Sequence, residues 1–218
     1  MKFYPFIFLC LFITLSCKKK ESDPTPMQPG KIIYTTTFDE GTWTTHTSSK
    51  YTSAYDKESF NLSIDTMNWF GYELAPSVFL TTSYSIEADV KITLHDVNQL
   101  GYAGFIYNYV NFENYSIMNI CTKGSFFAYK ITNGVGEQLV YNTFSRALIK
   151  GSGQNNTIKI KQRQHSQEFI FNGISQGILS FERDNRLVAV GVTAVTYPDF
   201  YTPTKATFDN FTVKQIYQ

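Results

Sequence analysis

The chain has 218 residues, which suits a single domain of about 190 residues behind a short N-terminal extension. Its formal net charge is +1, and this count includes Lys2, which lies in a segment that we expect to be removed. A nearly neutral mature chain argues against nucleic acid as a partner. Aromatic residues make up 17% of the sequence, an excess that is typical of β-rich domains with a large core.

Residues 1–16 are predicted to be a lipoprotein signal peptide. A positive charge is followed by an apolar run over residues 3–15, which is shorter than the roughly 20 residues that a transmembrane helix needs. Ser16 and Cys17 end this run in a pattern that resembles a bacterial lipobox, although Thr14 stands where the strongest lipoboxes carry Leu. The resemblance implies that Cys17 receives diacylglycerol and becomes the mature N-terminus. Ordinary secretion with cleavage nearby is the alternative.

Residues 17–30 are predicted to be a flexible tether. After Cys17 the sequence KKKESDPTPMQPG is polar and proline-rich, and such a segment cannot bury enough apolar surface to fold. Its three lysines suit a position beside lipid headgroups. We therefore expect a protein that reaches the membrane through its N-terminal lipid, in the cell envelope and most simply in the outer membrane of a Gram-negative bacterium.

The remaining cysteines predict neither a disulfide nor a zinc site. Cys10 lies in the removed segment and Cys17 carries lipid, so Cys121 is left alone in a strand, as a small buried apolar residue. A secreted domain of this size does not need disulfides for a stable core. The three histidines are scattered and, with one cysteine, make no zinc constellation.

From residue 31 onward the chain reads as β-strands. Lys31–Phe38 opens the domain, and Thr42–Lys57 is expected to be a loop or a weak hairpin. Val140, Phe144 and Leu148 fall at helical spacing, so one or two helical turns are an alternative there. The further predicted strands are Ser59–Asp65, Trp69–Ala75, Tyr84–Leu94, Leu100–Val110, Glu113–Cys121, Ser125–Thr132, Glu137–Asn142, Thr157–Gln164, Gln167–Asn172, Gln176–Glu182, Leu187–Val195 and Thr204–Ile216.

Three of these strands carry the clearest signals. Tyr84–Leu94 alternates apolar and polar residues without a fault, so one face is buried and its register is strongly fixed. We expect it to begin a meander with the three strands that follow. Asn172-Gly173 predicts a tight hairpin, and the apolar run Leu187–Val195 suits a central strand.

Strands separated by turn signals every 8–12 residues predict an all-β sandwich of two antiparallel sheets. The segments GYAGFIY, NYSIMNI, NNTIKIKQR, FIFNG and TFDNFTV resemble concanavalin A-like jelly rolls, among them the laminin-G-like and keto-disaccharide-hydrolase-like domains of bacterial surface proteins. The resemblance covers residues 31–218. It implies a jelly-roll fold whose members include lectins, binding modules, glycosidases and lipoproteins, so function has to be argued from the site.

One strand is similar to the E-x-D-x-E strand of laminarinase-like glycosidases on this fold. The resemblance implies Glu87 as nucleophile, but Lys91 stands where the acid/base glutamate would be. A retaining mechanism needs two carboxyl groups about 5–5.5 Å apart, and an ammonium cannot replace one of them. Glu87, Asp89 and Lys91 are therefore interpreted more simply as the polar face of an amphipathic strand.

Two further motifs also argue against catalysis. Keto-disaccharide hydrolases carry N-S-G-x-x-x-R where this chain has Tyr102 to Asn108, and only Gly104 survives. The loss of the Arg removes a rigid bidentate donor to sugar oxygens. Residues 173–177 match the G-x-S-x-G pattern of a nucleophile elbow, but that elbow needs a following helix and this segment continues as a strand. No catalytic residue is predicted.

Two polar groups are interpreted as structural. Lys159, Lys161 and Arg163 alternate with isoleucines and suit a solvated outer face, with a glycan or lipid-phosphate contact as the alternative. Asp209-Asn210 suits a bulge in the last strand. Some relatives of this fold bind calcium, but no D-x-D-x-D run supports such a site here, so no cofactor or metal is predicted.

The sequence therefore favours a lipid-anchored, non-catalytic jelly roll whose partner is carbohydrate. A glycoside hydrolase with an unrecognised site and a structural envelope protein without a small ligand are the alternatives. Sugar C–H faces pack on aromatic rings, while amides and carboxylates hold hydroxyl groups. If the rings instead only complete the core, there is no such site. The candidate glycan-binding residues are Trp69, Glu87, Asp89, Lys91, Tyr102, Asn108, Tyr115 and Asn119.

Overall fold

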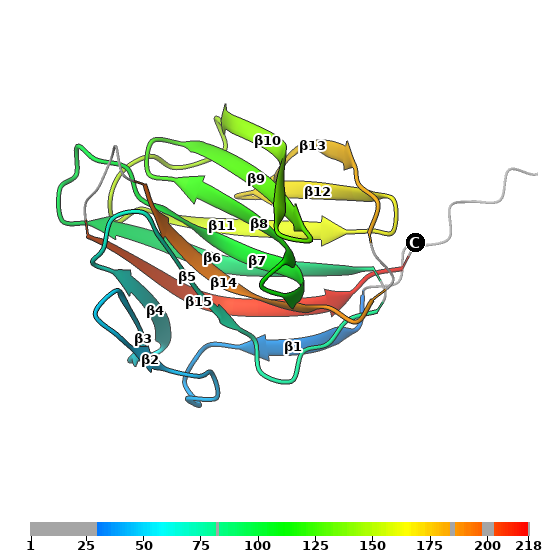
Figure 1. Ribbon diagram of the computed structural model, residues 1–218, viewed down its shortest axis with the longest axis horizontal. Coiled ribbons are helices and arrows are strands. Elements are labelled where there is room, and N and C mark those ends of the chain that lie inside the picture. The colour runs from blue at the N-terminus through cyan, green and yellow to red at the C-terminus, as the bar shows by residue number, and fades with distance from the viewer. Residues whose placement is uncertain (1–29, 82, 184–185, 198–202, 218) are drawn as a thin grey trace, which may run out of the picture.

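The computed structural model of the chain describes residues 30–81, 83–183, 186–197 and 203–217. Two antiparallel β-sheets pack face to face, and the described ranges contain no helix (Figure 1). The predicted all-β jelly-roll sandwich is confirmed. The predicted signal peptide, Cys17 and the tether up to residue 29 lie outside the described residues. Within the described ranges, no helix is long and apolar enough to cross a membrane.

The larger sheet has nine strands in the order β13-β12-β11-β6-β15-β4-β3-β2, with β1 beside the second half of β15. The central pair is β6 with β15, so the last strand of the chain lies in the middle of this sheet. Its strands are β1 (Ile32–Thr36), β2 (His46–Thr47), β3 (Tyr51–Asp56), β4 (Ser59–Ile64), β6 (Tyr84–Leu94), β11 (Asn155–Gln162), β12 (Ser166–Phe171), β13 (Ile174–Ser180) and β15 (Thr204–Gln215).

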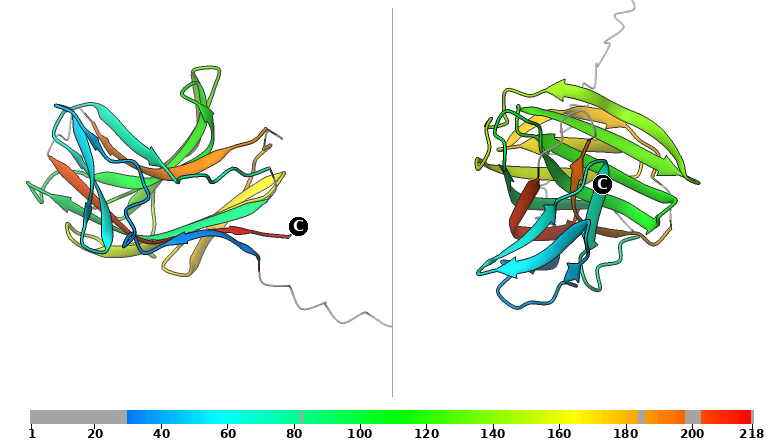
Figure 2. Two further views of the ribbon diagram at one scale, coloured as in Figure 1. Left: turned by 90° about the horizontal axis from the view of Figure 1, so that it is seen from below. Right: turned by 60° about the vertical axis from the view of Figure 1, so that its left-hand side comes forward.

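The smaller sheet has six strands in the order β10-β9-β8-β7-β14-β5. The four strands β7 to β10 form a meander, and β14 inserts between β7 and β5. Figure 2 shows the two layers edge-on, with the green loops at one end of the meander projecting away from the larger sheet. The strands are β5 (Trp69–Leu74), β7 (Tyr102–Asn111), β8 (Asn114–Cys121), β9 (Ser125–Thr132), β10 (Val135–Phe144) and β14 (Ala189–Thr196).

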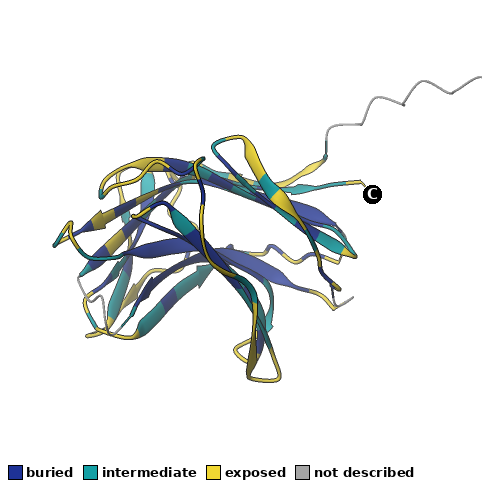
Figure 3. Cartoon of the chain, turned by 90° about the horizontal axis from the view of Figure 1, so that it is seen from above, coloured by how far each residue is buried: buried dark blue, intermediate teal, exposed yellow. Residues whose placement is uncertain are grey.

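The core lies between the sheets and follows the predicted alternation. All six apolar side chains of β6 are buried, as Tyr84–Leu94 predicted. The buried residues run along the central strands of both layers, while most exposed residues lie in loops and at the edges of the sheets (Figure 3). Each fully buried apolar side chain stabilises the fold by about 1.5–3 kcal/mol before entropy is counted, so this strand alone anchors a large part of the sandwich.

Two sequence expectations about local structure are wrong. β6 is not the first strand of the meander, because it pairs with β11 and β15 in the other sheet. The stretch around Val140 is not helical, because β10 continues as a strand to Phe144 and only a turn follows at Ser145–Leu148. There the pairing of β10 with β9 places alternate side chains on one face, and this tertiary pairing overrides the helical spacing.

The hairpin between β12 and β13 has the geometry that Asn172-Gly173 predicted. Asn172 (φ 49°) and Gly173 (φ 81°) both adopt the left-handed conformation that a two-residue type I′ turn requires. The Asn172 side chain also accepts a hydrogen bond from the Thr157 backbone N–H (2.8 Å) and donates to the Ala147 carbonyl (2.7 Å). Asn172 therefore both turns the chain and ties the hairpin to its neighbours.

Gly173→Ala is expected to lower the free energy of unfolding by about 1 kcal/mol, measured by chemical denaturation. The space around Gly173 is open, so the loss comes from the backbone conformation alone. Gly136→Ala is the matched control, since Gly136 lies in β10 without a positive φ and a new Cβ would meet only the end of the Ile131 side chain at 3.4 Å. If both substitutions cost the same, the turn does not require glycine.

Candidate functional site

The outer face of the six-stranded sheet, which points away from the core, carries aromatic rings. Gly71 faces Tyr51 and Ile64 of the larger sheet, so its neighbours Phe70 and Tyr72 point outward. On β14 the residues alternate in the same way: Val190, Val192 and Ala194 point into the core, and the small residues Ala189, Gly191 and Thr193 point outward. Because β14 has only small side chains on this part of the outer face, rings from the strands on either side can meet above it.

Four of these rings form what we call the aromatic strip, Phe70, Tyr72, Tyr109 and Tyr115. Ring centroids lie 5.5 Å apart for Phe70–Tyr72, 5.6 Å for Tyr72–Tyr109, 6.3 Å for Tyr109–Tyr115 and 5.9 Å for Tyr115–Phe70. The last pair is stacked, with 15° between the planes. The hydroxyls of Tyr72 and Tyr109 are hydrogen-bonded at 3.2 Å. The strip thus joins β5, β7 and β8 into one partly exposed platform.

Two tyrosines of the strip, Tyr72 and Tyr115, have raised pKa values. Burial raises the pKa of Tyr72 well above its usual value, and the hydrogen bond with Tyr109 raises it further. Burial also raises the pKa of Tyr115, with a smaller contribution from Tyr109. The hydroxyls of Tyr72 and Tyr115 therefore stay protonated at neutral pH and can both donate and accept hydrogen bonds.

Beside the strip, the same face holds a second small buried cluster. Tyr102 is only 5% exposed, with its ring 5.5 Å from Phe127 and 5.1 Å from Tyr197. Asn119 is fully buried, and neither its amide nitrogen nor its amide oxygen has a hydrogen-bond partner among the described residues. Both predicted candidates are therefore on this face but beneath other side chains, so neither offers a surface to a ligand.

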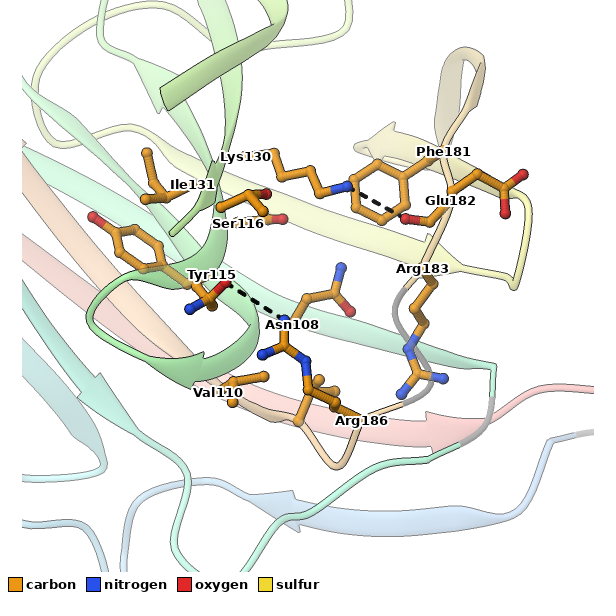
Figure 4. A pocket seen from close by; sticks show the side chains of 13 residues that line it. Asn108, Val110, Tyr115, Ser116, Lys130, Ile131, Phe181, Glu182, Arg183 and Arg186 are labelled. Atoms are coloured by element: carbon orange, nitrogen blue, oxygen red, sulfur yellow. Dashed lines mark hydrogen bonds between the residues drawn. The ribbon is translucent and has the colours of Figure 1, made fainter. Parts of the chain in front are cut away.

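A pocket of about 250 Å³ opens at the end of the sandwich, between the end of the meander and the segment after β13 (Figure 4). We call it the mouth pocket and define it by six of its lining residues, Asn108, Tyr115, Lys130, Glu182, Arg183 and Arg186. Tyr115 belongs to both the strip and the mouth pocket.

Asn108 lies in the mouth pocket rather than on the outer face. Its backbone has a φ of 50°, within a stretch where the pairing of β7 with β8 is irregular. The Tyr84 hydroxyl donates to the Asn108 side-chain oxygen at 2.8 Å, and the Asn108 amide donates to Gln162 at 3.3 Å. A β-bulge re-aims a side chain in this way. The expectation that Asn108 shares an outward face with Tyr102 is therefore wrong.

Glu87, Asp89 and Lys91 lie on the outer face of the other sheet, so they cannot share a site with Tyr102, Tyr115 or Asn119. Glu87 pairs with Lys159 at 2.6 Å. Asp89 accepts hydrogen bonds from the Thr157 hydroxyl and, at 2.8 Å, from the Asn210 amide. The sequence placed the two groups together because it assigned β6 to the meander, and the observed pairing of β6 separates them.

Trp69 is the first residue of β5, and its side chain lies on the core side of the sheet. It packs partly against the core, and the Lys50 ammonium lies 4.1 Å from the ring centroid. Its indole N–H is buried and finds no acceptor in the described part of the chain. Trp69 is thus separate from the strip formed by its neighbours Phe70 and Tyr72.

The basic residues of β11 lie on an outer face, and the Asp209-Asn210 pair lies at a bulge, as interpreted from the sequence. Lys161 pairs with Glu168 at 3.1 Å on the outer face of β11. Asp209 and Asn210 sit at a register shift between β15 and β6, with Asn210 at φ 52°. Cys121 is a buried free thiol. Within the described ranges, no three His, Cys, Asp or Glu side chains gather as a metal site would require.

Many solved structures resemble this chain, among them several of low sequence identity. The carbohydrate-binding module CBM66 from Bacillus subtilis superposes with a TM-score of 0.56 at 12% identity, covering 79% of this chain and 95% of that chain. The laminarinase catalytic domain from Thermotoga maritima gives 0.57 at 11% identity, covering 87% and 99%. A Bacillus subtilis protein of unknown function with a galectin-like fold gives 0.57 at 11% identity, covering 88% and 100%.

No protein-family model and no curated protein matches the sequence. At these identities the structural matches bear on the fold alone. They agree with the two antiparallel sheets and with the β content of the described ranges. The chain therefore has the concanavalin A-like jelly-roll fold.

Proposed function

We propose that this protein is a non-catalytic glycan-binding domain. The observation that carries the proposal is the aromatic strip, a half-buried platform of four rings on the outer face of the six-stranded sheet. Tyrosine combines an apolar face, on which the C–H side of a sugar can pack, with a hydroxyl that bonds to sugar oxygens. It also has few rotors to freeze on binding.

The proposal excludes hydrolysis at the carboxylates of β6. Glycosidases of the usual kind need two carboxyl groups on either side of the scissile bond, one of them able to donate a proton. Glu87 is ion-paired with Lys159, Asp89 is hydrogen-bonded to Asn210, and Lys91 replaces the acid. These groups also lie on the sheet opposite to the strip. Matches to a carbohydrate-binding module and to laminarinases support a carbohydrate ligand only at the level of fold.

We propose further that the domain is held in the cell envelope by a lipid on Cys17. The support comes from the sequence: a short apolar run, a small residue before Cys17 and a polar, proline-rich segment after it. A tether of 13 residues (18–30) spans roughly 20 Å as a flexible chain. That reach leaves the strip free to meet a glycan near the membrane surface.

A glycan array, followed by analysis of released sugars, tests the glycan proposal directly. On the best ligand of the array, Tyr72→Ala and Tyr115→Ala are each expected to weaken binding about tenfold, because a central aromatic contact is worth about 1.4 kcal/mol. Tyr141→Ala is the matched control, since Tyr141 lies on the edge strand β10 and is 76% exposed. Titration calorimetry gives the affinities, and circular dichroism checks that each variant is folded.

Three results would contradict the proposal. Binding of no glycan by the parent would remove the function, and release of sugars would make the domain an enzyme. Unchanged affinity in folded Tyr72→Ala and Tyr115→Ala variants would show that a ligand binds elsewhere.

A further inference from the structure

The strands of the six-stranded sheet place no charged side chain on its outer face. These six strands contain only three charged residues, Glu73, Lys130 and Glu137. Glu73 points the same way as Gly71, which faces the larger sheet, and its carboxylate accepts a hydrogen bond from β3 of that sheet at 2.8 Å. Lys130 alternates with Ala128, which lies on the core side, and Glu137 is the cross-strand partner of Lys130. The face of these strands that bears the aromatic strip is therefore uncharged.

A second group of rings lies on this uncharged face. Tyr129 and Tyr197 are partly exposed, and their rings pack edge to face on the buried ring of Phe127, with centroids 5.6 Å and 6.1 Å away. Burial, with a smaller contribution from Tyr129, raises the pKa of Tyr197 to about 12, so its hydroxyl stays protonated at neutral pH. We call Tyr129 and Tyr197 the second platform. It offers a ligand the same combination of ring face and hydroxyl as the strip.

Side chains of the same face join the second platform to the strip. The pairing of β8 with β9 places Ile117 directly opposite Tyr129, and Ile117 follows Tyr115 of the strip by two residues. Residues two apart on a strand point to the same side of the sheet. Phe70 of the strip packs against the same buried cluster as Tyr129 and Tyr197. The strip and the second platform thus belong to one partly exposed, mostly apolar surface.

This surface extends over five neighbouring strands, from β5 through β14, β7 and β8 to β9. Its outermost strands are four strand spacings of about 4.8 Å apart, which is roughly 19 Å in all. A single sugar ring cannot reach from Phe70 to Tyr129 across that width, whereas a chain of several sugars can. The two groups of rings therefore suit an extended ligand.

The absence of charge decides which glycan suits this surface. A carboxylate or a sulfate that packs on a half-buried apolar face loses part of its hydration, and no cation from the six strands lies on this side to compensate for the loss. Neutral sugar hydroxyls lose less, and the tyrosine hydroxyls can donate to them and accept from them. The C–H faces of the same sugars pack on the rings.

We infer that this face binds an uncharged glycan chain that is long enough to lie on the aromatic strip and on the second platform at once. The inference rests on the proposed glycan-binding function and narrows its ligand to neutral polysaccharides. The four rings of the strip hold one part of the chain, and Tyr129 and Tyr197 hold another. Because no ion pair contributes, the affinity depends little on salt.

The first experiment isolates the effect of charge. The full chain is titrated with hexasaccharides of glucan, mannan and galactan, each beside its C6-oxidised form, which carries a carboxylate on every sugar, and with every glycan that the array identifies. We expect a neutral hexasaccharide to bind about tenfold or more tighter than its oxidised form, with an affinity that changes less than about twofold between low and high salt.

A variant that adds charge tests the same argument in the opposite direction. Gln138 is exposed on the edge strand β10, directly opposite Tyr129, so Gln138→Lys adds a cation beside the second platform. The change should narrow the preference for the neutral hexasaccharide by about threefold or more at low salt, and less at high salt. An unchanged preference in the folded variant would show that charge on this face does not select the ligand.

The second experiment asks whether the ligand reaches both groups of rings. In the parent, the hexasaccharide should bind about tenfold tighter than the disaccharide of the same series, because only the longer chain covers the second platform. Tyr129→Ala should remove most of this gain, and Tyr197→Ala replaces it if that variant unfolds. Tyr217→Ala is the matched control, since Tyr217 is 54% exposed and follows the last strand of the larger sheet. Circular dichroism checks the fold of each variant.

The outcomes distinguish the inference from the proposed function. If Tyr72→Ala and Tyr115→Ala weaken binding but the oxidised hexasaccharide binds as tightly as the neutral one, the inference is wrong and the glycan function stands. The same conclusion follows if only acidic glycans bind, if the hexasaccharide binds no tighter than the disaccharide, or if the folded Tyr129→Ala variant keeps the full gain. If neither the array nor the hexasaccharides give a ligand, both proposals fall.

Discussion

Replacing Phe211 with Ala should lower the free energy of unfolding by about 3–5 kcal/mol, the range expected when a buried Phe is truncated. Phe211 is fully buried on β15, the central strand of the larger sheet. Its ring lies 5.0 Å from Trp43 and 6.1 Å from Phe105 of the opposite sheet, both edge to face. The substitution thus removes a contact that joins the two layers, in a core whose strands on either side cannot close over the gap.

Urea denaturation followed by tryptophan fluorescence measures this loss, and Phe112→Ala is the matched control. Phe112 lies in the turn between β7 and β8 and is 74% exposed, so the same truncation should cost less than about 0.5 kcal/mol. Phe211→Leu should recover a large part of the stability, because it refills most of the cavity. Equal losses for the two alanine variants would mean that Phe211 does not join the sheets.

The strands of this fold were predictable from local sequence, whereas the partners of the strands were not. The alternation in Tyr84–Leu94 and the Asn172-Gly173 pair are local signals, and both predicted the observed conformation. The pairing of β6 with β15 joins residues 110 or more positions apart, for instance Leu94 with Thr204. No local pattern encodes such a partner, so the meander was wrongly extended to include β6.

The same limit explains what was missed at the site. Placing Asn108 depended on strict alternation from Tyr102, and the irregular, positive-φ backbone at Asn108 breaks that alternation. Tyr115 was found because its strand keeps its register. Phe70 and Tyr72 were missed, although their alternation around Gly71 in a predicted strand was a usable signal.

The mouth pocket had no sequence signal at all. Lys130 and Arg183 are more than 50 positions apart and sit on segments that meet only when the meander and the strand after β12 close one end of the sandwich. Isolated basic residues at strand ends are common on solvated surfaces. Only the packing of the two sheets brings these cations to a shared cavity.

A Cys17→Ala substitution should abolish lipid attachment completely, because the thiol of Cys17 is the proposed acceptor and no other side chain at that position can form the thioether. The full-length chain is expressed in a Gram-negative host and labelled with an alkyne fatty acid. We expect no label on the variant and accumulation of the unprocessed precursor, whereas the parent is labelled and shortened. Cys10→Ala is the matched control, since it removes a thiol from the segment that is discarded.

Retained labelling in Cys17→Ala, or equal loss in Cys10→Ala, would contradict lipidation at Cys17 and leave ordinary secretion. The geometry gives the anchor a consequence for binding. The backbone N–H of Gln215 donates to the Lys31 carbonyl at 2.8 Å, so the first described residues are fixed beside the end of β15. Tyr84 pairs with Gln215 there and donates to Asn108 in the mouth pocket. The tether therefore joins the domain at the end that carries the mouth pocket, and a lipid on Cys17 would hold that pocket within roughly 20 Å of the envelope surface.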